Sequence, residues 1–346
     1  MGPGIERIGE IGTMSSTEAE RGFTKAMSFS DAVDEAETVE KPFGQALVEV
    51  AQSRADIVGL TADLAKYTDI DVFARNFPDR FFQLGMAEQN LVGVAAGLAR
   101  VGFTPFATTY CVFATRRAYD FIAIDLAVGR ANVKVIAGLP GLTTGYGATH
   151  QGIDDLALMR TVPNLVVVDP CDATEINQAV HAIAAYQGPV YMRILRGRVK
   201  RVFDPQRYTF ELGKANLLRS GKDVALISTG LMTERALQAA DLLQTGGIDV
   251  AVLHVPTLKP LDEEAIVHLA RETRTVLTLE NHSIVGGLGS AVAEAICMAG
   301  LTVTISKVGI RDHFVECGSV PHLNEKYGLS VPHIVRGAKD VLSRRS

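Results

Sequence analysis

The chain has 346 residues, of which 47% are hydrophobic and 21% charged, and its formal net charge is -5. This length suits about two domains, and the acidic balance argues against non-specific binding to nucleic acid. No apolar run reaches the roughly 20 residues that a membrane span needs, so no membrane partner is expected. None of the four cysteines belongs to a Cys-x-x-Cys pair, so the sequence predicts neither a zinc site nor a redox motif, and we expect a reduced, cytoplasmic protein.

Residues 1–40 are mostly polar and show no regular pattern, which predicts a flexible N-terminal tail. From Lys41 onward, short apolar strands alternate with amphipathic helices. This alternation is typical of a parallel sheet covered by helices on both faces. The first predicted domain, residues 41–195, has expected helices at 43–51, 88–100 and 173–186, and expected strands at 56–60, 81–84, 133–138, 165–168 and 190–194.

Residues 196–212 are polar, basic and irregular, and they predict a linker. The alternation of strands and helices then restarts and defines a second predicted domain, residues 213–346. The whole chain is therefore expected to be an α/β protein of two domains with mostly parallel sheets covered by helices. The expected strands of the second domain are 224–228, 250–253, 276–279 and 303–305, and its expected helices are 232–243, 263–270, 288–298 and 331–342.

A single carboxylate, Glu88, follows the apolar strand that starts at Phe81, and a helix of small residues begins there. A carboxyl group held against an apolar wall near a helix N-terminus is suited to acid/base chemistry. Most acids at this position only interact favourably with the helix dipole. The role of Glu88 therefore depends on its neighbours.

A glycine-rich loop, residues 138–151, follows another predicted strand and ends with His150 and Gln151. Its spacing fits neither a phosphate-binding P-loop nor a dinucleotide fingerprint, and a long surface loop is an equal alternative. Tyr110 and Phe113 are three residues apart, which predicts one helical face. Such a pair is usually core, and it also suits a wall for a flat heterocycle.

Five segments occur in one order along the chain, and together they are more specific than each is alone. In this order the chain resembles the C-terminal half of transketolase, which holds the pyrimidine-binding and C-terminal domains. The resemblance runs from about Lys41 to the end. The segments are Gly-Met-Ala-Glu-Gln-Asn (85–90), Thr-Tyr-Cys-Val-Phe (109–113), Gly-Ala-Thr-His-Gln (147–151), Asp-Pro-Cys-Asp-Ala-Thr-Glu (169–175) and Glu-Asn-His-Ser-Ile-Val-Gly-Gly-Leu-Gly-Ser (280–290).

The resemblance implies that Glu88 contacts N1′ of the thiamine aminopyrimidine and so helps to remove the C2 proton of the thiazolium. It implies that His150 lies close to the reacting carbon. Tyr110 and Phe113 correspond to the family's aromatic wall, and Asp63 corresponds to a cofactor-side aspartate. The third aromatic position of that wall is Arg116 here.

The positions that contact the sugar depart from the family. An aspartate cannot replace an arginine as a phosphate clamp, because both charges would be negative. Whether the substrates are phosphorylated therefore stays open. The family's aspartate, histidine, serine and phosphate-binding arginine are matched to Tyr146, Gly138, Tyr67 and Asp169, and the candidate replacement cations are Lys41, Arg116 and Arg117.

The chain contains no Gly-Asp-Gly segment, which in the family precedes an Asn and holds magnesium and the diphosphate. The resemblance therefore implies one subunit of a split transketolase. An N-terminal, diphosphate-binding partner subunit would bring Mg2+ and complete the thiamine diphosphate site in a heterotetramer. The expected reaction transfers a two-carbon ketol unit from a ketose to an aldose, free or phosphorylated, with a specialised sugar among the candidates.

Two alternatives remain open at the level of sequence. One is a β-type subunit of a 2-oxoacid dehydrogenase or a relative of deoxyxylulose-phosphate synthase, because both use the same pyrimidine-domain chemistry. The other is a non-catalytic regulatory paralogue that binds a partner without turnover.

Overall fold

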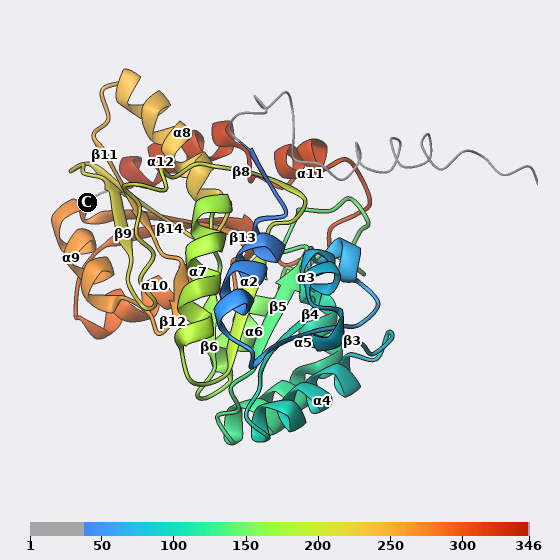
Figure 1. Cartoon of the computed structure of the whole chain (residues 1–346). Helices are drawn as coiled ribbons and strands as arrows, with labels where there is room; N and C mark the ends of the chain where they lie inside the picture. Colours follow the sequence, from blue (N-terminus) through green and yellow to red (C-terminus); the bar gives the residue numbers. More distant parts are fainter. Residues whose placement is uncertain (1–37, 345–346) are drawn as a thin grey trace, which may run out of the picture.

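The computed structural model describes residues 38–344. Two α/β units, each built around its own sheet, lie against each other (Figure 1). The predicted N-terminal tail lies outside the described residues apart from its last three, Thr38–Glu40, which form strand β1. Strand β1 pairs antiparallel with β8 (Arg198–Lys200), which lies within the segment predicted to be a linker.

The first sheet has seven strands in the order β12-β6-β7-β5-β4-β2-β3. All neighbouring pairs are parallel except β12–β6. Strands β2, β4, β5, β6 and β7 are buried along their whole length, as expected for a sheet covered on both faces. Strand β12 (Thr257–Lys259) comes from the second half of the chain and so links the two units. The others are β2 (Ile57–Thr61), β3 (Phe81–Gln83), β4 (Thr104–Tyr110), β5 (Lys134–Gly138), β6 (Val166–Val168) and β7 (Val190–Ile194).

Two layers of helices cover this sheet. Helices α2, α3 and α7 share one apolar core with one face, and α4, α5, the π-helical η4 and α6 share another core with the opposite face. Their bounds are α2 (Pro42–Ser53), α3 (Asp71–Asn76), α4 (Glu88–Arg100), α5 (Cys111–Phe121), η4 (Ile122–Val128), α6 (Asp155–Thr161) and α7 (Ala173–Ala185), with short 3-10 turns η2 (Ala65–Tyr67) and η3 (Pro78–Arg80).

The second sheet has five strands in the order β14-β13-β10-β11-β9, parallel except at the β11–β9 edge. Helices α8 and α12 cover one face, while α9 and α10 share their core with the α4–α6 layer of the first unit. The elements are β9 (Asn216–Arg219), β10 (Val224–Ser228), α8 (Met232–Thr245), β11 (Val250–His254), α9 (Glu263–Thr273), β13 (Thr275–Ser283), α10 (Leu288–Met298), β14 (Thr304–Ile310), α11 (Val320–Lys326) and α12 (Val331–Ser343).

The expected α/β fold with mostly parallel sheets is confirmed, and every helix and strand expected from the sequence is present with small shifts at its ends. One expectation is wrong in its local structure. Tyr110 and Phe113 do not share a helix, because Tyr110 ends β4 and Phe113 lies in the first turn of α5.

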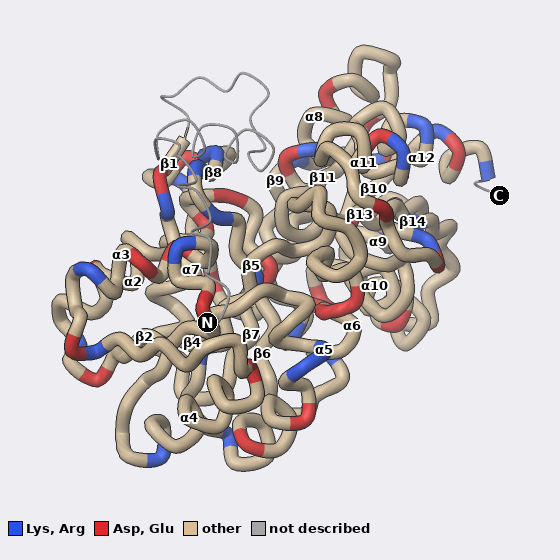
Figure 2. Tube along the Cα trace, turned by 90° about the vertical axis from the view of Figure 1, so that its right-hand side faces the viewer, with Lys and Arg blue, Asp and Glu red and all other residues tan. Residues whose placement is uncertain are grey.

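Acidic and basic positions are interspersed along the trace of both units (Figure 2). None of the helices within residues 38–344 is both long and apolar enough to cross a lipid bilayer.

Candidate active site

The candidate site lies at the carboxyl ends of the parallel strands of the first sheet, where ligands bind in open α/β sheets. One candidate residue follows the end of each of five strands. The residues concerned are Asp63 after β2, Glu88 after β3, Phe113 after β4, His150 after β5 and Arg196 after β7.

Glu88 is the first residue of α4 and is only 2% exposed. Its Oε1 accepts a hydrogen bond from Nη1 of Arg117 on α5 at 3.0 Å, and the Arg117 side chain is half-exposed. A buried carboxylate without a partner would be costly, so Arg117 serves as its counter-ion. The sequence predicted an isolated acid at this position and missed this partner.

Four rings gather where strands β4 and β5 end. The His150 ring lies 5.4 Å from Phe113, 6.2 Å from Tyr110 and 5.4 Å from Tyr146, in each case edge to face. Tyr110 and Phe113 lie 5.6 Å apart. We call these four residues the aromatic cluster. Separations and angles of this kind are the favourable ones for aromatic pairs.

Two members of the aromatic cluster have shifted pKa values, both in the direction that favours the neutral form. Burial, assisted by the charge of Arg117, lowers the pKa of His150, and its Nδ1 lies 2.8 Å from Thr149 Oγ1. Burial raises the pKa of Tyr110 to about 12. A neutral imidazole has a basic nitrogen that can accept a proton from a substrate hydroxyl.

The second unit holds the loop that carries His150. Asn281 accepts a hydrogen bond from the Leu142 amide at 2.8 Å and donates one to the Pro140 carbonyl at 3.2 Å. Gly141 has φ +52° and a Cβ there would meet the Asn281 carbonyl at 2.2 Å, so only glycine fits. The Glu-Asn-His motif of the second unit therefore positions the glycine-rich loop of the first.

Asp63 is exposed and lies at the edge of the site. Its amide donates to Gln83 Oε1 at 2.8 Å, and Gln83 Nε2 donates to Asp63 Oδ1 at 3.1 Å. These two bonds tie the ends of the neighbouring strands β2 and β3 together. Among the described residues, no hydrogen bond or ring contact joins Asp63 to Glu88 or to the aromatic cluster.

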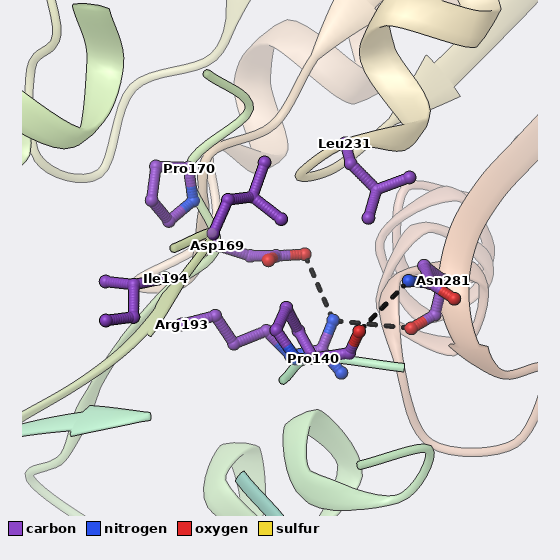
Figure 3. A pocket seen from close by; sticks show the side chains of 8 residues that line it. Pro140, Asp169, Pro170, Arg193, Ile194, Leu231 and Asn281 are labelled. Atoms are coloured by element: carbon purple, nitrogen blue, oxygen red, sulfur yellow. Dashed lines mark hydrogen bonds and ion pairs between the residues drawn. The ribbon is translucent and has the colours of Figure 1, made fainter. Parts of the chain in front are cut away.

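Asp169 does not face the aromatic cluster. It is 4% exposed, and its Oδ2 accepts hydrogen bonds from Arg193 Nη1 at 3.4 Å and Thr229 Oγ1 at 3.2 Å. Figure 3 shows its carboxylate aimed at Arg193 in a small pocket that Asn281 also lines. Asp169 therefore belongs to a buried network between the two units and is no substitute for a sugar-binding cation.

Arg196, just past β7, is a site residue that the sequence analysis missed. The Arg196 guanidinium lies 5.7 Å from the ring centroid of Tyr67. Its positive charge acts to lower the pKa of the Tyr110 phenol, whereas Tyr67 and Tyr146 act to raise it. A Cβ on Gly138 would lie 3.5 Å from the Tyr110 ring, so Gly138 borders the same region. The position of Arg196 directly after a parallel strand could have identified it as a candidate site residue. It was overlooked because residues 196–212 have the polar, basic composition of a linker.

The three cations expected to replace a missing phosphate clamp are each paired with a carboxylate. Their pairs are Lys41 with Asp71 at 2.8 Å, Arg116 with Asp154 at 2.9 Å, and Arg117 with Glu88 at 3.0 Å. Within the described part of the chain, no group of three or more His, Cys, Asp or Glu side chains could hold a metal ion.

Comparisons with known proteins agree with this arrangement. The transketolase pyrimidine-binding domain matches residues 36–201, and the transketolase C-terminal domain matches residues 213–334. An uncharacterized transketolase family protein of Sinorhizobium fredii is 52% identical over 95% of this chain and 96% of its own length. A 6-deoxy-6-sulfo-D-fructose transketolase subunit of Clostridium sp. strain MSTE9 is 42% identical over 87% of this chain and 93% of its own.

The chain is also similar to 1-deoxy-D-xylulose-5-phosphate synthase of Heliobacterium modesticaldum, at 38% identity over 88% of this chain and 47% of that enzyme. A solved structure described as a split gene transketolase in an inactive beta4 tetramer superposes with a TM-score of 0.82. It is 44% identical, and the match covers 88% of this chain and 98% of that one. The chain therefore belongs to the transketolase family, with the pyrimidine-binding and C-terminal domains of that family.

Proposed function

We propose that this chain is the pyrimidine-domain subunit of a thiamine diphosphate-dependent transketolase that moves a two-carbon ketol unit from a ketose to an aldose. The observation that carries the proposal is the buried acid Glu88, whose counter-ion Arg117 lies 3.9 Å from the ring centroid of Phe113 in the aromatic cluster that contains His150. An acid and a neutral base with different surroundings are the arrangement that proton transfer requires.

The residues present fit one half of the cofactor. Phe113 and Tyr110, whose rings lie 5.6 Å apart, are the aromatic side chains that would line a flat pyrimidine, and Glu88 is the acid that would meet its ring nitrogen. Arg117 connects the two, because it bonds Glu88 and lies 3.9 Å from the ring centroid of Phe113. Family members depend on thiamine diphosphate, which when bound supplies a carbanion that accepts and releases the ketol unit. A partner subunit holds the diphosphate and Mg2+ in this proposal.

Each residue of this chain then has a stated task. Glu88 holds or releases the proton at N1′ of the pyrimidine. His150 accepts a proton from a substrate hydroxyl through its neutral imidazole and returns it later. Phe113 and Tyr110 orient the ring and exclude water, which strengthens the interaction between Glu88 and the pyrimidine.

Exposed apolar side chains on η4 and at the end of α5 offer a partner a surface in this proposal. Ile124 and Val128 of η4 are 57% and 70% exposed, and Phe121, the last residue of α5, is also exposed. Helix η4 packs against α4, on which Gly93 and Gly97 leave open space for a close approach. Exposed apolar surface of this kind suits an interface, and a heterotetramer of two such pairs is the assembly we propose.

The substrate of one similar chain guides the choice of sugar. That relative is a subunit of a 6-deoxy-6-sulfo-D-fructose transketolase, and this chain places Arg196 near Tyr67 and Tyr110. We propose a ketose with an anionic group at the end remote from the carbonyl, held by Arg196.

The test is to mix this chain with a candidate diphosphate-binding subunit, thiamine diphosphate and Mg2+, and to follow ketol transfer by chromatography. Sulfonated, phosphorylated and neutral ketoses are compared as donors. Transfer only in the mixture supports the proposal, and transfer by this chain alone contradicts the subunit assignment. Binding of the cofactor without transfer to any aldose would instead support a regulatory paralogue.

A second candidate follows from the similarity to 1-deoxy-D-xylulose-5-phosphate synthase. Such an enzyme, like a 2-oxoacid dehydrogenase, uses a 2-oxoacid as donor. Replacing the ketose by pyruvate in the same mixture separates the two, since carbon dioxide release from pyruvate would favour the second candidate.

A further inference from the structure

Arg117 is a charged side chain that contacts both the acid and the aromatic cluster of the candidate site. Its guanidinium donates to Glu88 Oε1 at 3.0 Å and lies 3.9 Å from the ring centroid of Phe113. Its charge also acts on His150, whose ring lies 5.4 Å from the same Phe113. A guanidinium this close to a ring face is attracted to it, so Phe113 fixes Arg117 from one side and Glu88 from the other.

This contact bears directly on where a proton resides. A guanidinium in contact with a carboxylate favours the ionised form of that carboxylate. Arginine itself does not titrate in the range where enzymes work. Its effect at this site is therefore that of a fixed positive charge, which opposes a proton on Glu88.

The other ionisable groups near Glu88 do not supply this charge. Among the described residues, Arg117 is the only group hydrogen-bonded to the Glu88 side chain. Strand β2 carries no ionisable side chain. The ionisable groups on the other elements packed against α4, and on the neighbouring loop, are Tyr110 on β4, Cys111, Arg116, Tyr119 and Asp120 on α5, Asp125 on η4, and His150.

We propose that Arg117 is a positioning residue that keeps Glu88 ionised, so that the proton shared between Glu88 and N1′ of the cofactor pyrimidine resides on N1′. The proposal rests on the proposed function for the identity of the cofactor. In the step concerned, N1′ would take up one proton from solvent as the cofactor binds, and the Glu88 carboxylate, which stays paired with Arg117, would accept a hydrogen bond from it. The bond formed is N1′–H, and the bond broken is the one that held this proton to water or buffer.

Without Arg117 the proton would reside on Glu88 in preference to N1′. A buried carboxyl group that has lost its cation is protonated in preference to carrying an unpaired charge. Glu88 would then enter the complex with its own proton and leave N1′ unprotonated. The number of protons taken up from solvent when the cofactor binds therefore reports the role of Arg117.

The experiment is calorimetric titration of thiamine diphosphate into the assembled two-subunit enzyme near pH 7, in buffers of different ionisation enthalpy. We expect uptake of about one proton in the unmodified enzyme, as required for an ionised Glu88 and a protonated N1′. Uptake falls by at least half in Arg117→Gln and returns in Arg117→Lys. The matched control is Arg100→Gln, an exposed arginine in the last turn of α4, which leaves the uptake unchanged.

The pH profile of kcat/KM gives an independent readout, because loss of the charge moves its acid limb upward by about one pH unit. Arg117→Met retains the aliphatic packing of the side chain and provides a second neutral variant if Arg117→Gln does not assemble. Uptake in both neutral variants equal to that of the unmodified enzyme overturns the proposal. Proton uptake requires no turnover, so an enzyme that binds cofactor but transfers no ketol unit refutes the proposed function and still decides the role of Arg117.

Discussion

The imidazole of His150 meets the ring of Phe113 edge to face, with centroids 5.4 Å apart and planes at 68°. His150 lies in the loop after β5 and Phe113 in the first turn of α5, directly after β4. Since β4 and β5 are neighbouring parallel strands, their carboxyl ends bring the two side chains together. The aromatic cluster is therefore a product of the sheet order.

Replacing Phe113 by alanine removes a ring that contacts Tyr110 and His150 and supports Arg117. We expect the affinity of the assembled enzyme for thiamine diphosphate to fall about 10-fold, which corresponds to about 1.4 kcal/mol. Calorimetric titration of thiamine diphosphate into the assembled enzyme measures this change in affinity. Phe103→Ala, which removes an exposed ring just before β4 at the opposite end of that strand, is the control, and equal affinities in the two variants would contradict the proposed role.

Glu88→Gln retains the shape of the side chain and removes its ability to exchange a proton. Ketol transfer by the assembled enzyme is expected to fall about 100-fold or more, the usual contribution of a positioned acid/base group. Glu294→Gln provides the control, because Glu294 is also paired with an arginine, Arg160, at 2.9 Å but is exposed. Comparable transfer rates in both variants would remove Glu88 from the mechanism.

His150→Gln removes the neutral imidazole while leaving a polar side chain beside Thr149. We expect kcat for ketol transfer to fall about 100-fold with little change in thermal unfolding, since His150 is only partly buried. His181→Gln, on the exposed side of α7, should leave the rate unchanged. A normal rate in the His150 variant would assign the histidine to packing alone.

Asp169→Arg introduces the cation that the family places at a sugar-phosphate site. In this chain the position is buried against Arg193 and Gly230, so we expect loss of stability and no gain in phosphate binding. Arg193 keeps its ion pair with Asp155, so the introduced arginine is a second buried cation that has lost the carboxylate there. Such a charge costs roughly 3–5 kcal/mol, which lowers the midpoint of denaturant unfolding. A folded variant with improved use of sugar phosphates would show that Asp169 faces the substrate.

Asp69 gives a prediction for pH. Burial raises the pKa of this carboxyl from 3.8 to about 6, against the opposing effect of the Gly197 amide that donates to it at 2.8 Å. The folded state then binds the proton more tightly than the unfolded state, so this stabilisation is complete below about pH 4 and is lost as pH rises through 6. This change in the pKa of Asp69 corresponds to a loss of about 3 kcal/mol in the free energy of unfolding between acidic and neutral pH.

Asp69→Asn keeps an oxygen that can accept the Gly197 bond and removes the titration. Urea unfolding between pH 4 and 7 should therefore show a smaller decline in stability for this variant than for the unmodified chain. Asp79→Asn, in the exposed turn η3, is the control. Parallel stability curves for all three proteins would exclude Asp69 as the source of the decline.

The fold followed from the sequence because strands buried on both faces read as short apolar runs and helices as amphipathic ones. Strand β4 escaped recognition because three threonines, Thr104, Thr108 and Thr109, interrupt its apolar pattern although all of it is buried. Strand β12 has three residues and pairs with a strand some 90 positions away, a partner that local pattern does not reveal.

The sequence by itself determined the α/β architecture, the membership of Glu88 and His150 in one ordered set of motifs, and the similarity of that set to transketolase. Only the tertiary structure decided that Arg117 is the counter-ion of Glu88, that Asp169 is buried between the units, and that Arg196 lies against Tyr67. The physical reason is that a charge has its effect through the groups within a few ångströms of it. Those groups come from the ends of different strands, whose order in the sheet is not written in their order along the chain.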